Sequence, residues 1–423
     1  MLVLLGIFLL LLILKVPVGF SLFGSSVTYM IINDIPLEVA AQRLGYGPDS
    51  FALLAVPFFI LAGCIMNSSG VTQRIFDFAD RLVGHIHGGL GHANILASVI
   101  FSGMSGAAIA DTGGLGAIEL KAMKDAGYDE NFSLAITGAS SIIGPIIPPS
   151  IPAVIFAVAA GASTGRLFVG GIIPGLMMAG ALSIMVYYYS KKNNYPKSER
   201  STFKEILLAI KRAFFPLLTP VIILGGIIGG IFTPTEAAIV AVFYAIILGF
   251  YYKSIIVKDL PKLLLETINT TISVLFIIAS ANLFAWILTT SQVPQQLAAS
   301  FLAVVSNKYV ALIIINLFLL FVGFFMETLA ALTILVPILL PITTSLGIDP
   351  IHFGIIMILN LMIGLCTPPV GMVLYVLAGI AKVPFERIAK AIIPYVVVLY
   401  GVLLLITFVP ELVLFLPDLL LNK

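Results

Sequence analysis

Charged residues and cysteine are both scarce in this sequence. Asp, Glu, Lys and Arg make up 10% of the 423 residues, whereas soluble domains carry roughly 25%. Hydrophobic residues make up 60%, and the mean hydropathy is +1.15. The two cysteines, Cys64 and Cys366, both lie in apolar surroundings and predict neither a disulfide framework nor a metal site. The composition therefore excludes a soluble globular domain and predicts an all-α protein that crosses the membrane several times.

Patterns for nucleic-acid binding and for catalysis are also missing. The formal net charge is +2, and no basic stripe with interleaved aromatic residues is present, so the sequence predicts no nucleic-acid partner. It contains no nucleophile motif, no Gly-rich phosphate loop and no His-Glu-x-x-His. We therefore predict that the protein is not an enzyme.

An internal repeat is the strongest feature that the sequence does contain. Seven Gly, Pro and Asp residues recur 220 positions later: Gly103/Gly323, Gly127/Gly347, Asp129/Asp349, Gly144/Gly364, Pro148/Pro368, Pro149/Pro369 and Pro174/Pro394. Backbone-breaking residues at matching positions of two hydrophobic halves are typical of secondary transporters built from inverted repeats. Residues 191–212 hold seven of the 22 Lys and Arg residues, which predicts a cytoplasmic basic linker. This linker separates predicted repeats at 1–190 and 213–423.

The sequence predicts about ten to twelve membrane elements in all. The first 32 residues are apolar and predict either one long helix or two short helices broken near Lys15–Gly19. Each repeat also contains a segment that is too short for two spanning helices of about 20 residues each. The first such segment is 88–124, with a middle rich in Gly, Ser and Ala, and the 220-residue offset places its partner at 308–347. Both predict re-entrant hairpins whose tips line a site, because irregular backbone at membrane depth must be buried in protein or face water.

A helix interrupted by Gly and Pro follows each hairpin. The first covers about 130–163 and breaks at 144–149, and the second covers about 351–381 and breaks at 364–369. Proline removes an intrahelical donor and leaves carbonyl oxygens unpaired, which is costly in lipid unless something binds them. Dehydrated Na⁺ suits such oxygens, because carbonyls and hydroxyls are ligands of hard cations. A simple proline kink is the alternative at a single break, whereas two matched breaks favour paired Na⁺ sites.

Polar residues gather near the breaks and the hairpin tips. Asp111 and Glu327 are charges at membrane depth, which predicts either a place in a central cavity or a cap on a hairpin helix. The hydroxyl groups near the first break belong to Ser102, Ser105, Thr112, Thr137, Ser140 and Ser141, and those near the second to Thr328 and Thr367. Small polar residues also hold packed membrane helices together, so the sequence leaves that alternative open.

Three motifs carry a resemblance to a known family. They are 103–113 (Gly-Met-Ser-Gly-Ala-Ala-Ile-Ala-Asp-Thr-Gly), 144–150 (Gly-Pro-Ile-Ile-Pro-Pro-Ser) and 367–371 (Thr-Pro-Pro-Val-Gly). Over essentially its whole length, the chain resembles the large membrane subunit of tripartite ATP-independent periplasmic (TRAP) transporters. The resemblance implies an inverted-repeat elevator transporter in the bacterial inner membrane, which imports a carboxylate such as sialic acid or a C4-dicarboxylate and is driven by Na⁺. It also implies three partners: membrane lipid, a small four-helix membrane subunit and a periplasmic binding protein.

The resemblance also implies positions for the substrate and for two or more Na⁺ ions. It places the substrate at Ser105, Asp111, Thr137, Ser140 and Thr328. It places a first Na⁺, held largely by backbone oxygens, at Ser102, Gly103, Gly144, Ile147 and Pro149. It places a second Na⁺ in the same manner at Gly323, Gly364, Thr367 and Pro369.

No arginine lies at the predicted hairpin tips or in the two broken helices, although a bound carboxylate usually meets an arginine or a helix N-terminus. We therefore hypothesise that N-termini of the hairpin helices, together with bound Na⁺, hold the carboxylate. Two other functions stay open at this point. One is a stand-alone Na⁺- or H⁺-coupled carboxylate or ion transporter that needs no binding protein, and the other is a channel or scaffold subunit.

Overall fold

The structure is a computed structural model, and it describes residues 2–305 and 307–421. Residues 1, 306, 422 and 423 lie outside this part, so the predicted outer limits of the two repeats are not described. Among the described residues all regular secondary structure is helical and no strand occurs. The predicted all-α fold is confirmed.

The helices fall into two halves of the chain, joined by a non-helical linker at 194–202. The first half contains α1 (Leu2–Ile13), α2 (Val18–Ile32), α3 (Leu37–Tyr46), η1 (Phe51–Leu54), α4 (Ala55–Ser68), α5 (Val71–Val83), α6 (Gly89–Ser105), α7 (Ala108–Asp125), α8 (Glu130–Ser141), α9 (Ile151–Ala160), α10 (Thr164–Gly170) and α11 (Ile172–Asn193). The second half contains α12 (Phe203–Ile228), α13 (Pro234–Tyr251), η2 (Val257–Asp259), α14 (Leu260–Thr290), α15 (Val293–Val304), α16 (Lys308–Gly323), α17 (Thr328–Ser345), α18 (Pro350–Gly364), α19 (Met372–Ala381), α20 (Phe385–Phe408) and α21 (Glu411–Leu421).

Seven helical segments among the described residues are long and apolar enough to cross a membrane. Other apolar helices have only 10–17 residues, which is short for a full span of about 20. Large apolar side chains on α13, α16 and α20 are exposed, such as Phe243 (65%), Leu317 (62%) and Val397 (63%). Extended apolar exposure of this kind is tolerated in lipid and avoided in water. The predicted polytopic membrane fold is confirmed.

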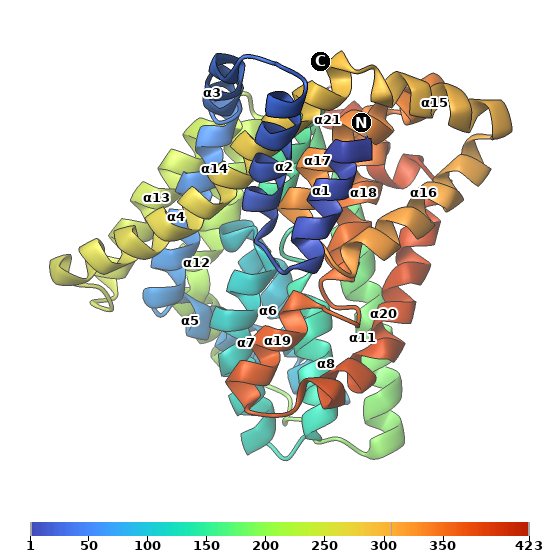
Figure 1. The fold of residues 1–423 in the computed structure, drawn as a ribbon. Coiled ribbons are helices and arrows are strands. Elements are labelled where there is room, and N and C mark those ends of the chain that lie inside the picture. The colour runs from blue at the N-terminus through green and yellow to red at the C-terminus, as the bar shows by residue number, and fades with distance from the viewer. Residues whose placement is uncertain (1, 306, 422–423) are drawn as a thin grey trace.

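Four helices, α4, α12, α13 and α14, form a slanted group that we call the outer arm (Figure 1). Within it α13 lies along α4, and α14 lies along both α4 and the short helix α2. The first 32 residues form two short helices, α1 and α2, on either side of a turn at Leu14–Pro17, rather than one long helix. The outer arm borders the part of the molecule that contains the hairpins.

Two helix pairs turn back on themselves, α6 with α7 and α16 with α17. Their chains turn at Gly106–Ala107 and at Phe324–Glu327, within the segments for which the sequence predicts hairpins. Gly106 has a φ of +61°, a backbone conformation that favours glycine. The two pairs lie toward opposite ends of the molecule, and their tips point to its middle (Figure 1).

A glycine and an aspartate that recur in the repeat precede each broken helix. Gly127 and Gly347 have φ values of +80° and +72°, which end the preceding helix. The side chain of Asp129 then accepts a hydrogen bond from Phe132 N at 2.9 Å, and that of Asp349 accepts one from Ile351 N at 2.7 Å. These are N-caps of α8 and α18. Four of the recurring positions therefore serve helix boundaries rather than a binding site.

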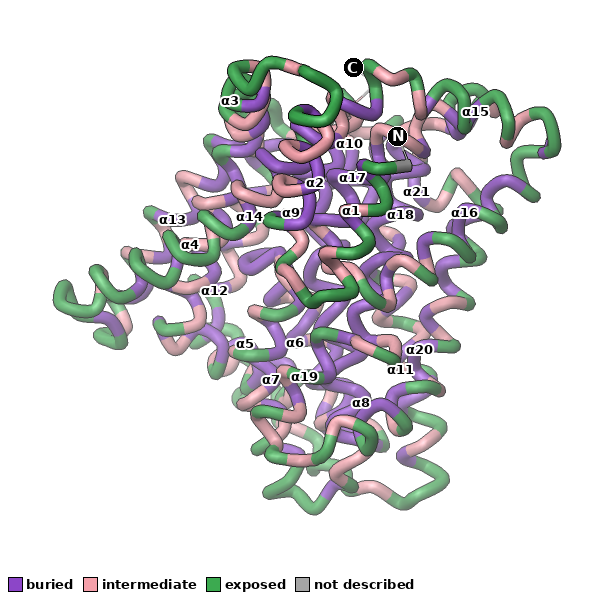
Figure 2. Tube along the Cα trace, in the orientation of Figure 1, coloured by how far each residue is buried: buried purple, intermediate pink, exposed green. Residues whose placement is uncertain are grey.

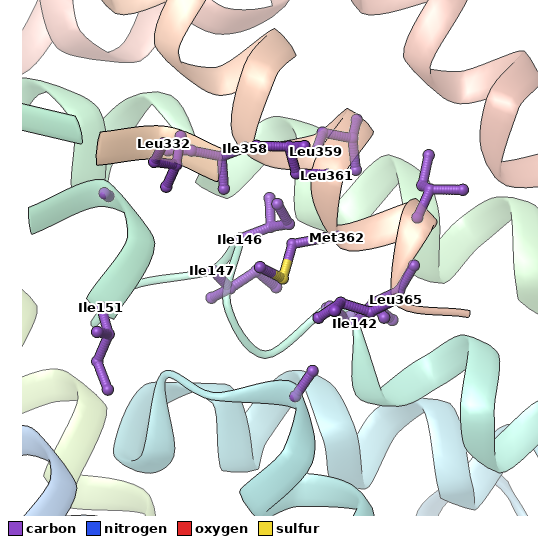
Figure 3. Close-up of a cluster of buried hydrophobic side chains, with 14 of the residues drawn as sticks. Ile142, Ile146, Ile147, Ile151, Leu332, Ile358, Leu359, Leu361, Met362 and Leu365 are labelled. Carbon is purple, nitrogen blue, oxygen red and sulfur yellow. The ribbon is translucent and has the colours of Figure 1, made fainter. Parts of the chain in front are cut away.

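The two breaks meet near the centre of the molecule. Figure 3 shows Ile146 and Ile147 of the first break beside Met362 of α18, and Ile142 beside Leu365. Every residue of α18 after its first is buried, and the helix lies in the buried interior in Figure 2. The thiol of Cys366 donates a hydrogen bond to the carbonyl of Gly138 at 3.1 Å, which joins the two broken helices directly. The second half of the chain thus packs into the first around the breaks.

Candidate functional site

A cavity of about 660 Å³ lies between the two hairpin tips and the outer arm. Its walls come from α4, α14, the α6–α7 turn, the start of α17 and the two breaks. Its polar lining side chains are Asn67, Ser105, Asn269, Thr270, Ser273 and Glu327. Within the described part of the chain, no Lys, Arg or His lines it. The cavity therefore offers neutral polar groups and helix ends to a ligand, but no cationic side chain.

The first turn of α7 faces this cavity with free backbone donors. Its N-cap residue, Ala107, provides no side-chain cap, and Ala107 through Ala110 line the cavity. The N–H groups of Ala108, Ile109 and Ala110 have no hydrogen-bond acceptor in the described residues. A helix end in this state carries partial positive charge and favours a bound anion. The end of α7 can therefore receive a carboxylate.

The matching end of α17 is closed by its own side chain. Glu327 lines the cavity, but its carboxylate accepts hydrogen bonds from Leu329 N at 2.9 Å and from Ala330 N at 3.1 Å. It is the N-cap of α17. The sequence predicts either a cavity position or a cap for this residue, and the structure combines both.

Asp111 neither caps α7 nor lines the cavity. Its side chain is 1% exposed, and one carboxylate oxygen accepts a short hydrogen bond from Ser105 Oγ. The other oxygen has no hydrogen-bond partner among the described residues. A Cβ added to Gly144 would collide with this oxygen, so it lies against the first break. A buried carboxylate oxygen without a partner is costly, which makes it a candidate ligand for a cation.

The other predicted substrate residues divide between the cavity and the packed interior. Ser105 lines the cavity. Thr137 accepts a hydrogen bond from Asn94 Nδ2 at 2.8 Å, and Ser140 donates one to Asn94 Oδ1 at 2.6 Å. Thr328 is buried and donates to the carbonyl of Leu361 at 3.5 Å. Only Ser105 of these residues is in contact with the cavity, and substrate binding by the set stays a prediction.

The predicted ligands of the first Na⁺ lie where the hairpin tip meets the first break. Ser102 and Gly103 belong to the last turn of α6, where helical carbonyls lose their donors. In the described residues the carbonyls of Gly144, Ile147 and Pro149 accept no backbone N–H. The turn residue Gly106 abuts the carbonyl of Pro149 and accepts from Ile151 N at 3.5 Å. The hairpin tip therefore contacts the first break at Pro149 and Ile151, and the binding of Na⁺ there stays a prediction.

The predicted ligands of the second Na⁺ also lie where a hairpin tip contacts a break, but the groups there are less polar. A Cβ added to Gly364 would lie 2.7 Å from the carbonyl oxygen of Gly323, so tip and break touch here as well. The carbonyl of Gly364 accepts from Thr367 N at 3.0 Å, whereas those of Thr367 and Pro369 accept no backbone N–H in the described residues. No carboxylate corresponds to Asp111 at this position, because residue 331 is alanine.

The chemistry of both sets fits an alkali cation better than a transition metal. The described residues contain no group of three or more His, Cys, Asp and Glu side chains that could hold a metal ion. Backbone carbonyls and one carboxylate are oxygen ligands, which hard cations prefer. The residues present therefore fit Na⁺.

Four polar residues of the cavity were not predicted from the sequence: Asn67 on α4 and Asn269, Thr270 and Ser273 on α14. All four lie in helices that read as ordinary apolar spans, far in sequence from the repeat motifs. The signal that could have identified them is their spacing, since residues 269, 270 and 273 share one face of a helix. Their position opposite the hairpin tips depends on how α14 packs.

Comparison with known proteins identifies the family. A family described as "Tripartite ATP-independent periplasmic transporter, DctM component" matches residues 5–412. The chain belongs to this family. The DctM-family chain is accordingly a multi-pass inner-membrane transporter subunit and not an enzyme, as the sequence predicts.

Two relatives indicate which subunit it is. The DctM-family chain is 48% identical over 408 residues to the sialic acid TRAP transporter large permease protein SiaM of Vibrio cholerae, and the match covers 96% of each protein. It is 36% identical over 435 residues to the C4-dicarboxylate TRAP transporter large permease protein DctM of Rhodobacter capsulatus, covering 99% of each. The chain is therefore a TRAP transporter large permease subunit.

A solved structure shares the fold at low sequence identity. The YdaH transporter of Alcanivorax borkumensis matches with a TM-score of 0.66 and 16% identity, over 88% of this chain and 87% of that one. The arrangement of helices in the DctM-family chain therefore occurs in a transporter of experimentally known structure.

Proposed function

We propose that this large permease subunit is the transport core of a Na⁺-driven TRAP transporter that imports a carboxylate, such as sialic acid or a C4-dicarboxylate. The observation that carries the proposal is the uncapped N-terminus of α7 in a cavity between two hairpin tips. The names of the relatives, which refer to sialic acid and C4-dicarboxylates, support the substrate class.

The carboxylate of the substrate binds at the start of α7. It accepts hydrogen bonds from the free N–H groups of Ala108, Ile109 and Ala110, and Ser105 Oγ lies at the same end of the cavity. Hydrogen bonds to a charged acceptor stabilise by about 1.5–3 kcal/mol each. This explains how a carboxylate is held without an arginine.

Na⁺ is held where each hairpin tip meets its break. The carbonyls of Gly144, Ile147 and Pro149 and the free oxygen of Asp111 would hold the first ion. The carbonyls of Gly323, Thr367 and Pro369, with Gly364 beside them, would hold the second. When bound, Na⁺ supplies positive charge close to the carboxylate site. Two or more ions per transport cycle are therefore expected.

The cavity position supports an elevator motion. One wall of the cavity belongs to the outer arm and the other to the hairpins and breaks. A displacement of the hairpin-bearing core along the arm would carry the substrate across the membrane while the arm stays in place. The hairpin and the outer arm are in direct contact where Gly103 of α6 abuts Pro220 of α12. This contact has no room for a larger side chain.

The family name and the relatives support two protein partners. One is a small four-helix membrane subunit, which belongs to the same permease, and the other is a periplasmic protein that delivers the substrate. The exposed apolar side chains of the outer arm and of α16 and α20 face membrane lipid or the small subunit.

Transport into proteoliposomes tests the function. The large subunit is reconstituted with its small subunit, and uptake of radiolabelled N-acetylneuraminate and of succinate is followed with and without a Na⁺ gradient and the binding protein. We expect uptake only when the gradient and the binding protein are both present. Uptake without the binding protein would instead indicate a stand-alone transporter, and channel-like currents would contradict the proposal.

A further inference from the structure

Helix α14 has an apolar side and a polar side, and residues on both sides are exposed. One face is exposed and apolar, with Leu265 at 62% and Ile272 at 60% exposure, as expected for contact with lipid. The other face lines the cavity with Asn269, Thr270 and Ser273. Polar side chains within a membrane-spanning helix are costly and by default serve a function. This polar face of α14 has no role in the Na⁺ sites or at the α7 carboxylate site.

The hydroxyl groups of this face have already used their hydrogens. Thr270 Oγ1 donates to the carbonyl of Glu266 at 3.1 Å, and Ser273 Oγ donates to the carbonyl of Asn269 at 3.0 Å. Each hydroxyl oxygen can therefore only accept a further hydrogen bond from a ligand. The side-chain amide of Asn269 has no hydrogen bond among the described residues and can both donate and accept. The polar face thus favours a ligand that brings O–H or N–H donors.

A second carboxylate would find poor partners here. A carboxylate only accepts hydrogen bonds, so it would be opposed by the lone pairs of Thr270 and Ser273 and supplied by the Asn269 amide alone. No Lys, Arg or His among the described residues lines the cavity, and the Glu327 carboxylate adds negative charge to it. A sugar hydroxyl meets the opposite situation, because it donates to these oxygens without carrying charge.

We propose that Asn269, Thr270 and Ser273 bind the neutral, hydroxyl-bearing part of the substrate, while its single carboxylate lies at the N-terminus of α7. The preferred substrate is then a polyhydroxylated monocarboxylate, a sugar acid, rather than a dicarboxylate. This inference rests on the proposed function. It assigns a specificity role to the outer arm, which contains none of the repeated Gly and Pro positions.

Thr289 of α14 offers a matched control for a test of this proposal. Thr289 lies on the same helix, is exposed, and donates to the carbonyl of Ala285 at 2.7 Å, so its hydroxyl is engaged as that of Thr270 is. It does not line the cavity. Thr270→Val and Thr289→Val therefore remove the same chemical group from the same helix, and only the first removes it from the cavity. Ser273→Ala serves as a second, smaller change if Thr270→Val proves unstable.

The experiment compares two substrates in proteoliposomes that contain both permease subunits under a fixed Na⁺ gradient. N-acetylneuraminate and an analogue with a shortened glycerol side chain are each supplied on a binding protein that carries both. Uptake rates are measured against the concentration of loaded binding protein. We expect Thr270→Val and Ser273→Ala each to lower kcat/KM for N-acetylneuraminate about three- to tenfold, the effect of losing one neutral hydrogen bond. The shortened analogue should lose less, and Thr289→Val should match the wild type for both substrates.

The outcomes separate this inference from the function on which it rests. Failure of the wild type to take up any carboxylate would overturn the proposed function and the inference with it. Wild-type uptake with Thr270→Val and Ser273→Ala both equal to Thr289→Val would overturn the inference alone. An equal loss for both substrates would also overturn it, since a role in packing, unlike one in recognition, affects every substrate alike.

Discussion

The two hairpin tips occupy matching places in the repeats but present opposite electrostatics to the cavity. α7 begins at Ala107 without a side-chain cap, so its backbone donors are free. α17 begins at Glu327, whose carboxylate satisfies the donors of its own helix. A second difference lies behind the tips, where Asp111 faces the first break and alanine stands at the matching position 331. Matching positions of the two repeats therefore present one uncapped helix end with a buried carboxylate behind it and one helix end capped by its own side chain.

The largest effect is expected when the open tip is made like the closed one. Ala107→Asp should cap α7 and stabilise the helix by about 1 kcal/mol, because Asp is a strong N-cap. The same carboxylate would repel the substrate from the α7 donors, and like charges in contact cost several kcal/mol. Uptake should therefore fall about 100-fold, as measured in the proteoliposome assay.

The neutral cap Ala107→Ser is the control for this prediction. It competes for the same backbone donors without adding charge, so uptake should fall by less than in Ala107→Asp. Wild-type rates in the Asp variant would show that the α7 N-terminus does not hold the carboxylate.

The second prediction concerns the cation sites. Asp111→Asn removes the charged oxygen that faces Gly144 and should raise the Na⁺ concentration for half-maximal uptake about tenfold. Glu327→Gln is the matched control, because the carboxylate of Glu327 accepts hydrogen bonds from the first turn of its own helix. The Na⁺ dependence of uptake checks both variants. An equal rise in this Na⁺ concentration in both variants would contradict the assignment of a cation ligand to Asp111 alone.

A third prediction concerns a feature that the two repeats share, a buried asparagine with side-chain hydrogen bonds. Asn94 bridges Thr137 and Ser140 in the first repeat, and in the second Asn360 Nδ2 donates to Asn316 Oδ1 at 2.8 Å. Asn94→Ala and Asn316→Ala should each lower the free energy of unfolding by about 1–3 kcal/mol, because each leaves buried polar partners unsatisfied. Thermal unfolding of the purified protein measures this. Thr137→Val adds a sharper comparison. A rise in KM that, converted to a free energy, exceeds the loss in the free energy of unfolding would support the predicted substrate role of Thr137.

The smallest effect is expected at an exposed contact between the two halves. Arg387 of α20 forms an ion pair with Glu130 at 2.7 Å and donates to Asn131 Oδ1 at 2.6 Å. The side chains of the pair are 43% and 40% exposed, so solvent screens them. Arg387→Ala should destabilise by less than about 1 kcal/mol, and by even less at high salt. A loss comparable to that of Asn94→Ala would show that this contact is more than a surface pair.

The features that the sequence predicts correctly are those for which the backbone itself carries the signal. The family and the membrane fold are confirmed, and the helix pairs and non-helical breaks lie at the segments marked by Gly and Pro. These residues act locally, through allowed φ angles and missing N–H donors, so their effect can be read without knowing what surrounds them. Asp129 and Asp349 are similar, because an N-cap acts on its own helix.

Side-chain roles were harder to predict, because they depend on the neighbours. Glu327 could cap or line, and it does both. Thr137 and Ser140 lie close to the first break in sequence, yet in the structure they bond to Asn94 on another helix. The polar face of α14 had only the spacing of its residues as a signal, and that signal is weak, since Asn, Thr and Ser in an apolar helix are common in packed membrane proteins.

The repeat of Gly, Pro and Asp at an offset of 220 residues is a property of the sequence alone, and it determines where the chain turns and where its helices stop. Such positions are set by covalent geometry and need no partner. Which helix end stays open, which oxygen of Asp111 remains unpaired, and which face of α14 meets the cavity were decided only when the two halves packed together. Burial and hydrogen-bond satisfaction are shared between segments far apart in sequence, so only the assembled fold assigns them.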